Sequence, residues 1–406
     1  MITGTRPPLE ATRDPSDPKR GSGVVEQVDR EGPVHRRTTT RRRESDSMYP
    51  QAANSPAGTD HPDGLTAGLQ RVALITGPNT VQLQTTRVPE PTGRQVAVKV
   101  DLCGVCVAEV KAFHTGAGHG PELCGHEWTG RVVATGPEVA DVKTGQRVVV
   151  GVPAPCGECE SCAAGRTDFC SFVMTVARGR DPGAAPHGGF ATVMTVPEYR
   201  VVAAPHHLAA EEAAFVEPAA IAWHAVRRAC IAPGDRVEIL GAGPIGLLLL
   251  QLAKVAGAGT VAVTEPNRKR RALASALGAD DVRADTGDGL TKPDIVFECT
   301  GMPQALQSAV DHVRQGGKII VVGDAAFAEV QPRLWLAKEA TVIAAAGYTR
   351  AEMEQAMNLI ADGRVTVTPL HTRTVGLGAL AGALIDLAEA CPKDVKILVD
   401  PWMEDS

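Results

Sequence analysis

Aromatic residues are scarce in this chain of 406 residues, where Phe, Trp and Tyr together make up 3%. The core must therefore be built mainly from Ala, Val, Leu and Ile. No apolar run approaches the roughly 20 residues that span a bilayer, so we expect no membrane segment. An excess of basic charge is also missing, since the net charge is −6, and we expect neither nucleic acid nor an anionic membrane as a partner. The remaining composition, 44% hydrophobic and 22% charged, is typical of a soluble globular protein with one or two full cores.

Residues 1–66 lack any periodic apolar pattern and are rich in Pro, Arg, Thr, Ser, Asp and Gly. Such a segment cannot bury enough apolar surface to offset its ordering entropy, so we predict a disordered tail. Its basic run at 35–43 leaves open an arm that binds a polyanion. The segment also lacks the apolar core of a secretory signal, which favours a cytoplasmic chain. Met48 stands just before the regular pattern, and we hypothesise that the real start codon lies there.

From Gln70 onward, short β-branched runs alternate with turn residues. This pattern predicts an all-β, barrel-like domain, with strands over 71–76, 81–84, 95–102, 131–135 and 147–152.

Four cysteines follow these strands at tight spacing: Cys156, Cys159, Cys162 and Cys170. Four thiolates so close together predict a closed tetrahedral zinc site, which is structural because no coordination position is left open. The spacing alone also allows an iron–sulfur cluster. Disulfides are disfavoured in a chain without an export signal.

A second set of candidate metal ligands is spread over the sequence. Cys106, His126 with Glu127, and Glu217 together supply one sulfur, one nitrogen and two carboxylates. This mixed set suits a catalytic zinc that keeps one position open for water or substrate. Cys103 and Cys124 are further thiols nearby, so the spacing does not decide which cysteine binds.

The stretch from Val237 to Glu265 predicts a dinucleotide site. An apolar strand, 237–240, runs into the glycine pattern Gly241-x-Gly243-x-x-Gly246. A helix from Pro244 to about 255 and a strand over 260–264 follow. The first glycine permits a tight turn, the second lets the backbone approach a pyrophosphate, and the third allows close packing of helix and strand. The helix N-terminus then offers N–H groups to the phosphates.

The acid Glu265 ends this unit, 19 residues after Gly246. A carboxylate at this point accepts hydrogen bonds from the adenosine ribose and repels a 2′-phosphate, so it favours NAD over NADP. The basic run 268–271 lies close by and leaves NADP open as the alternative.

Taken together, the chain resembles the zinc-dependent medium-chain dehydrogenase/reductase family, which includes the alcohol dehydrogenases, and within it the polyol (sorbitol-like) and threonine dehydrogenase branch. The resemblance covers about residues 69–400. Its motifs, in family order, are Gly104-Val-Cys106, Gly125-His-Glu127, Gly145-Gln-Arg-Val148, the four-cysteine loop, Gly188-Gly-Phe-Ala191, Glu217-Pro218, Gly241-Ala-Gly-Pro-Ile-Gly246, Glu298-Cys-Thr-Gly301 and Gly316-Gly-Lys-Ile319.

The resemblance implies an α/β fold of two parts. A GroES-like β-barrel catalytic domain is expected over 68–206 and 348–406, and a Rossmann domain with a doubly wound parallel sheet over 207–347. It also implies a homodimer or homotetramer. Two zinc ions per chain and NAD are the expected cofactors.

The resemblance also implies roles for single residues. Cys106, His126 and Glu127 would ligate the catalytic zinc, and Glu217 would reach it directly or through water. Pro244 and Ile245 would belong to the dinucleotide loop with the three glycines, Glu265 would bind the ribose, and Arg270 would lie near the adenine end.

One segment departs from the family pattern. After the zinc-binding cysteine, members usually carry x-(Ser/Thr)-Asp-x-His, whereas this chain carries Ala108, Glu109 and Lys111 at the three specified places. A methyl group cannot pass a proton. We therefore expect the alkoxide proton to leave by a bound water, by Glu127 or Glu217, or toward Lys111, which is equally well a solvated surface lysine.

Three functions are compatible with these observations. The first is an NAD-dependent zinc dehydrogenase that oxidises a secondary alcohol of a polyol, cyclitol or amino alcohol. The second is an NADPH-dependent carbonyl reductase of the same fold, or a dehydrogenase of aminocyclitol biosynthesis, to which the segment 125–130 bears some resemblance. The third is a protein that binds zinc and dinucleotide without turnover.

Overall fold

The computed structural model describes residues 68–116, 120–286, 291–389 and 392–404. The predicted tail at 1–66 and the proposed start at Met48 lie outside these residues.

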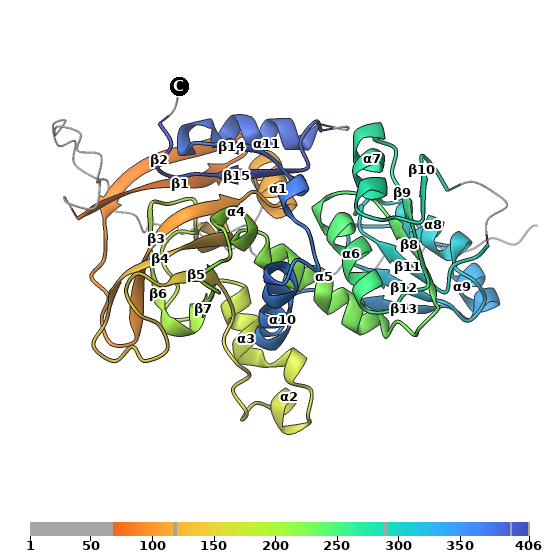
Figure 1. The fold of residues 1–406 in the computed structure, drawn as a ribbon, viewed down its shortest axis with the longest axis horizontal. Coiled ribbons are helices and arrows are strands. Elements are labelled where there is room, and N and C mark those ends of the chain that lie inside the picture. Colours follow the sequence, from red (N-terminus) through yellow and green to blue (C-terminus); the bar gives the residue numbers. More distant parts are fainter. Residues whose placement is uncertain (1–67, 117–119, 287–290, 390–391, 405–406) are drawn as a thin grey trace, which may run out of the picture. The chain divides into compact units, whose positions relative to one another are not determined.

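Most strands of the N-terminal part of the chain join one mixed sheet of seven strands, in the order β14-β15-β3-β4-β5-β7 with β6 paired to β3 (Figure 1). A separate hairpin, β1–β2, precedes them. The strands are β1 (Leu69–Gly77), β2 (Thr80–Arg87), β3 (Gln95–Gly104), β4 (Glu127–Thr135), β5 (Arg147–Val150), β6 (Val193–Pro197), β7 (Val201–Ala203), β14 (His371–Val375) and β15 (Lys396–Val399).

The C-terminal segment returns to this sheet, because β15 pairs antiparallel with β3 at Leu398↔Gly104 and Val399↔Cys103. Lys396, on β15, is thereby brought to the end of β3, just before the candidate ligand Cys106. The predicted limits of the catalytic domain, 68–206 and 348–406, remain a prediction.

The second sheet has six parallel strands in the order β10-β9-β8-β11-β12-β13. Its strands are β8 (Arg236–Leu240), β9 (Thr260–Thr264), β10 (Asp281–Arg283), β11 (Ile295–Glu298), β12 (Lys318–Val321) and β13 (Thr341–Ala344). The order reverses next to β8, the first strand of this sheet in the sequence. In open parallel sheets, ligands bind at the carboxyl ends of the strands at such a switch point.

The helices are α1 (Val107–Thr115), α2 (Glu160–Ala163), α3 (Ser171–Ala177), α4 (Ala210–Ala213), α5 (Val216–Ala229), α6 (Pro244–Val255), α7 (Arg268–Ala276), α8 (Ala305–His312), α9 (Pro332–Lys338), α10 (Arg350–Ala361) and α11 (Leu380–Ala388). No helix in the described part of the chain is long and apolar enough to cross a membrane.

The largest apolar core is aliphatic, as the shortage of aromatic residues predicted. It contains the leucine run 247–250 of α6, all fully buried, together with alanines of α5 and aliphatic residues of α10. Helix α5 packs against both α6 and α10. Because this packing fixes α5, the acid at its first turn, Glu217, has a defined place.

Candidate active site and zinc sites

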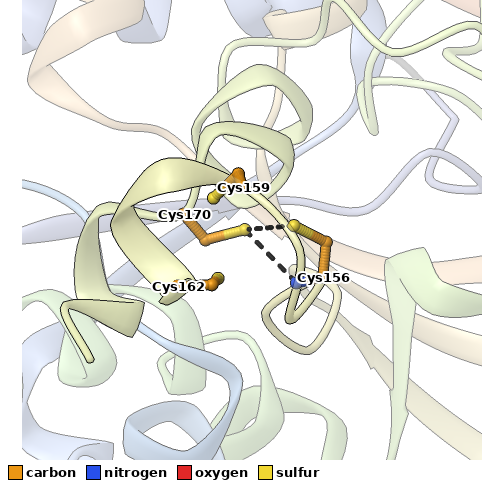
Figure 2. Close-up of side chains that lie close together, drawn as sticks. All are labelled: Cys156, Cys159, Cys162 and Cys170. Carbon is orange, nitrogen blue, oxygen red and sulfur yellow. Dashed lines mark hydrogen bonds between the residues drawn. The ribbon is translucent and has the colours of Figure 1, made fainter. Parts of the chain in front are cut away.

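The four-cysteine loop brings all its thiols together (Figure 2). The ligand atoms of Cys156, Cys159, Cys162 and Cys170 all lie within 4.8 Å of one another. The Sγ atoms of Cys156 and Cys170 are 3.5 Å apart, and the Cys156 amide donates to Sγ of Cys170 at 3.3 Å. Four sulfur donors that converge on one point fit a tetrahedral metal ion.

Local backbone geometry prepares this loop for a metal. Cys159 caps α2 and Cys170 caps α3, so backbone amides surround the sulfurs. The amides of Ser171 and Cys162 lower the pKa of the Cys159 thiol to about 6. Metal binding requires thiolates, and these amides stabilise that form.

The second group of candidate ligands also converges. Cys106 caps α1, His126 directly precedes β4, and Glu127 is the first residue of β4. Their ligand atoms lie within 4.8 Å of one another, and neither Cys103 nor Cys124 belongs to this group. The structure thus singles out Cys106 among the three cysteines that the spacing left open. One sulfur, one nitrogen and one carboxylate fit a zinc ion that keeps a fourth position open.

Glu109 holds the histidine of this group. Its buried carboxylate lies 2.7 Å from Nδ1 of His126 and also accepts from the amides of Cys106 and Gly125 at 2.8 and 3.1 Å. Burial lowers the pKa of His126, but Glu109 and Cys106 together outweigh burial and raise it well above the usual value. With Nδ1 facing Glu109, Nε2 is the nitrogen left for a metal.

Glu127 meets a buried cation. Lys396 and Glu127 are each only 2% exposed, and Nζ of Lys396 pairs with Oε2 of Glu127. The same ammonium donates to the Val105 carbonyl at 3.0 Å. Gly104 leaves room for this pair, since a Cβ there would lie 2.1 Å from Oε2 of Glu127. The lysine balances a carboxylate that would otherwise be buried beside other acids.

A cavity of about 390 Å³ adjoins this group. Its wall includes His126 of this ligand group, Ala108 of α1, Glu217 and His224 of α5, and Tyr348 from the loop before α10. Glu217 lies outside the group of mutually close ligand atoms formed by the other three predicted ligands. It borders the same cavity as His126, where a substrate would meet both.

Glu217 is a buried acid with an unusual proton affinity. Burial, together with the nearby negative charge of Glu127, raises the pKa of Glu217 to about 7. Burial and the nearby charge of Glu217 in turn raise the pKa of Tyr348 well above its usual value. A carboxylate with a pKa near neutrality can take up and release a proton under working conditions.

Lys111 does not line the cavity. Its Nζ lies 2.7 Å from Oδ2 of Asp324 and also donates to the Asp324 carbonyl. The ion pair joins α1 to the loop after β12.

The glycine loop follows β8 as predicted. Gly241 has φ +99° and Gly246 packs against it, since a Cβ on Gly246 would lie 1.9 Å from the Gly241 carbonyl. A Cβ on Gly243 would meet nothing within 4 Å, so this side of the loop is open. Pro244 and Ile245 begin α6. An open loop at the N-terminus of a 12-residue helix fits a dinucleotide pyrophosphate.

The acid at the end of β9 is tied to that loop. Glu265 accepts from the Ala242 amide and from the Asn267 amide, both at 2.8 Å. Arg270 donates to the Asp394 carbonyl at 2.9 Å, so its guanidinium is directed at the C-terminal segment. The predicted ribose and adenine contacts of these two residues stay predictions.

Four residues of the site escaped the sequence prediction: Glu109, Lys396, Tyr348 and His224. Glu109 had a signal, because an acid three residues after an N-cap forms a capping box, which Glu109 makes with Cys106. Lys396 and Tyr348 are far in sequence from the candidate metal ligands. Only the packing of β15 on β3 and of α10 on α5 brings these two residues to the site.

Two family descriptions match the chain. "Alcohol dehydrogenase GroES-like domain" matches residues 92–206, and "Zinc-binding dehydrogenase" matches residues 244–362. Among curated relatives, 2-dehydro-3-deoxy-L-galactonate 5-dehydrogenase of Pseudoalteromonas atlantica is 30% identical over 325 residues, which cover 76% of this chain and 92% of the relative. (R,R)-butanediol dehydrogenase of Bacillus subtilis is 30% identical over 351 residues, which cover 79% and 96%.

Solved structures agree with these relatives. A zinc-binding dehydrogenase from Sinorhizobium meliloti with bound NADP superposes with a TM-score of 0.73 at 28% identity, covering 82% of this chain and 99% of the other. The combination of a GroES-like β domain with a Rossmann sheet is thus confirmed.

This fold, with two convergent ligand groups and a glycine loop at a sheet switch point, defines a zinc-dependent oxidoreductase of the medium-chain type. The chain belongs to the zinc-dependent alcohol dehydrogenase family, in its polyol dehydrogenase branch.

Proposed function

We propose that this protein is an NAD-dependent dehydrogenase that oxidises a secondary alcohol of a polyol, cyclitol or amino alcohol. The observation that carries the proposal is the cavity that brings His126 of the ligand group and Glu217 to one wall. Relatives at 30% identity are named for a sugar acid and a diol, which supports an alcohol with neighbouring oxygen groups.

Cys106, His126 and Glu127 would hold the catalytic zinc, with Glu217 near it. Zinc in such a site acts as a Lewis acid that makes an alcohol oxygen more acidic. Cys156, Cys159, Cys162 and Cys170 would hold a structural zinc.

The chain's own residues perform the remaining work. Glu109 fixes the ring of His126, and Ala108 carries no hydroxyl to pass a proton. We assign the proton of the alcohol to Glu217, whose pKa of about 7 suits transfer near neutral pH. With a dinucleotide bound, the alcohol carbon would lose a hydride to the nicotinamide and its oxygen would lose a proton, so that one NAD⁺ would give one NADH, one ketone and one proton. Glu127 and Lys111 stay alternative proton acceptors.

The dinucleotide would lie along Gly241, Gly243, Pro244, Ile245 and Gly246. Glu265 would face the adenosine ribose and Arg270 the adenine end. The open side of Gly243 supports the pyrophosphate contact.

A second candidate is an NADPH-dependent carbonyl reductase of the same fold, including one of aminocyclitol biosynthesis. The supporting observation is that Arg268 and Lys269 are exposed at the start of α7, where they would contact a 2′-phosphate next to Glu265.

We also propose that the chain forms a homodimer or homotetramer in the cytoplasm. Strand β13 ends the six-stranded sheet within the described residues. Its Val342 and the neighbouring Leu336 on α9 are exposed. An open edge strand with apolar side chains is a surface that a second copy would cover.

The proposal is tested by turnover of a panel of polyols, cyclitols and β-hydroxy amino acids with NAD and with NADP. We expect NADH formation with at least one member and none with His126→Ala, whose fold should be kept. If no member is oxidised with either cofactor by zinc-loaded protein, the chain is a binding protein and the proposed function is wrong.

A further inference from the structure

The cavity next to the proposed catalytic zinc carries two arginines at its wall. Arg178 caps the C-terminal end of α3, and Arg200 ends a short 3-10 turn, residues 198–200, before β7. Both come from the catalytic domain, as does His126. Neither has a role in the proposed hydride or proton transfer.

The two arginines are held differently. Arg200 is half-buried, and its Nη1 donates to the Val176 carbonyl at 2.6 Å. This bond fixes the guanidinium beside α3 and leaves its other N–H groups to the cavity. Arg178 is exposed, and its side chain makes no ion pair or hydrogen bond with another described residue. An arginine offers up to five N–H donors in a planar fork that matches a carboxylate or a phosphate.

One acid of the cavity wall opposes the positive charge of these arginines. Asp168 also lines the cavity and is exposed, and it would weaken the attraction of the wall for anions. The wall carries two guanidinium groups against this one exposed carboxylate. The remaining acid of the wall, Glu217, has its own part in the proposed proton transfer, so the other charged residues of the wall are more positive than negative.

We propose that the alcohol substrate carries an anionic group, a carboxylate or a phosphate, which Arg178 and Arg200 bind while the reacting carbinol lies at His126 and Glu217. The substrate class is then a hydroxy acid or a sugar alcohol phosphate and not a neutral polyol. His224 also lines this cavity, and because Glu352 holds its Nδ1 at 3.0 Å, its Nε2 is left for a substrate hydroxyl. This inference rests on the proposed function and specifies its substrate.

The test uses compounds that share one carbon skeleton and differ at one end. For each of several stereoisomers, kcat/KM with NAD is measured for the neutral polyol, the aldonate, the polyol phosphate and the amino polyol. We expect an anionic member to exceed its neutral counterpart by about 10-fold or more, which is the size of a charge-assisted hydrogen bond. The KM of that anion should rise with added salt while the KM of the neutral compound stays constant. The aldonate and phosphate arms tell which anion is bound.

Substitutions of the two arginines test whether these side chains cause the preference for an anionic substrate. Arg178→Met and Arg200→Met should each lower the anion-to-neutral ratio of kcat/KM by about 10-fold, through KM. Arg180→Met is the matched control, because Arg180 is exposed two residues beyond Arg178 and is absent from the cavity wall; it should keep the ratio. Arg200 also bonds the α3 backbone, so Arg178→Met carries the test if Arg200→Met fails to fold.

The outcomes separate this inference from the proposed function. Oxidation of neutral or amino polyols at rates equal to or above the anions overturns the inference and leaves the dehydrogenase assignment intact. An amino polyol that is preferred, and that loses its preference in Asp168→Asn, shows a cation site instead. Absence of turnover for every compound overturns both.

Discussion

At the scale of single residues, the unusual feature is the missing relay hydroxyl. Ala108 lines the cavity where the family usually has Ser or Thr, while Glu217 and Tyr348 line the same wall. We propose that this buried carboxylate accepts the proton that a relay hydroxyl would otherwise pass on.

Glu217→Gln should therefore lower kcat by about 100-fold, within the usual range for loss of a general base, while NADH binding is kept. Burial raises the pKa of Glu217 to about 7, so its carboxyl is protonated below that pH and is a base above it. In wild type, kcat should fall as the pH drops through the pKa of this group, and the variant should lose that limb. Bound zinc would move the limb to lower pH.

The prediction is tested by pre-steady-state kinetics and by measuring kcat as a function of pH for the wild type and for Glu217→Gln, Ala108→Ser and Lys111→Met. Ala108→Ser should be tolerated. An unchanged kcat and pH profile in Glu217→Gln would exclude Glu217 as base, and loss of the limb in Lys111→Met would assign the proton to the lysine that we find paired with Asp324.

At the scale of elements, we propose that the β8–α6–β9 unit sets the preference for NAD over NADP. Glu265 is 6% exposed and its carboxylate binds the loop amides of Ala242 and Asn267. Glu265→Ser should therefore both lose the repulsion of a 2′-phosphate and loosen the loop.

We expect the NAD-to-NADP ratio of kcat/KM to exceed one in wild type and to fall by about 10-fold or more in Glu265→Ser, as expected when one ion interaction is lost. Steady-state kinetics with both cofactors measure the ratio. Arg268→Met is a useful companion, because it should lower the NADP value alone. A wild-type preference for NADP would show that the carboxylate does not face the ribose.

The N-terminal ends of β8 and β11 are joined by an ion cluster. Asp294 accepts from the amide and Nε of Arg236 at 2.8 and 3.1 Å and from Nε of Arg314 at 2.5 Å. Burial raises the pKa of Asp294, but these donors outweigh it and lower the pKa to about 2. Its contribution to stability is thus fully present above the unfolded value of about 4 and is lost as the pH falls toward 2.

Asp294→Asn should lower the free energy of unfolding by about 2 kcal/mol at pH 7, the equivalent of this pKa difference. The deficit should shrink as the pH is lowered through 4, and it should vanish near pH 2. Denaturant unfolding at several pH values measures the free energy of unfolding of wild type and of Asp294→Asn. Effects of metal loss at low pH cancel in the difference because both proteins share the same metal sites. A deficit independent of pH would indicate a packing effect instead.

At the scale of the whole molecule, two ligand groups imply two zinc ions per chain. Elemental analysis should find two per wild-type chain and one in either Cys159→Ser or His126→Ala. The two variants should differ in stability, because structural zinc binding is coupled to folding: Cys159→Ser should lower the melting temperature strongly and His126→Ala little. One zinc per wild-type chain would contradict this assignment.

Much of the architecture was predictable from the sequence because its signals are local. The strand–glycine loop–helix unit was predicted with the helix at 244–255 and the strand at 260–264, and the structure has the same bounds. Periodicity, glycine positions and helix starts act within about 20 residues, so no tertiary contact is needed to recognise them. The thiol loop at 156–170 is local in the same way.

The sequence by itself thus determined the thiol cluster and the dinucleotide loop, since each depends on short-range steric and hydrogen-bonding rules, and the family resemblance of its motifs implied the fold class. The spacing left Cys103, Cys106 and Cys124 equivalent; the family resemblance implied Cys106, and the tertiary structure places Cys106 with His126 and Glu127. It also decided that Lys396, 290 residues after Cys106 in the sequence, neutralises Glu127, and that Arg178 and Arg200 share a cavity with Glu217. These residues become neighbours because β15 pairs with β3 and α5 packs on α10. Burial then shifts the pKa of a group such as Glu217, and the residues next to it in the sequence do not reveal this shift.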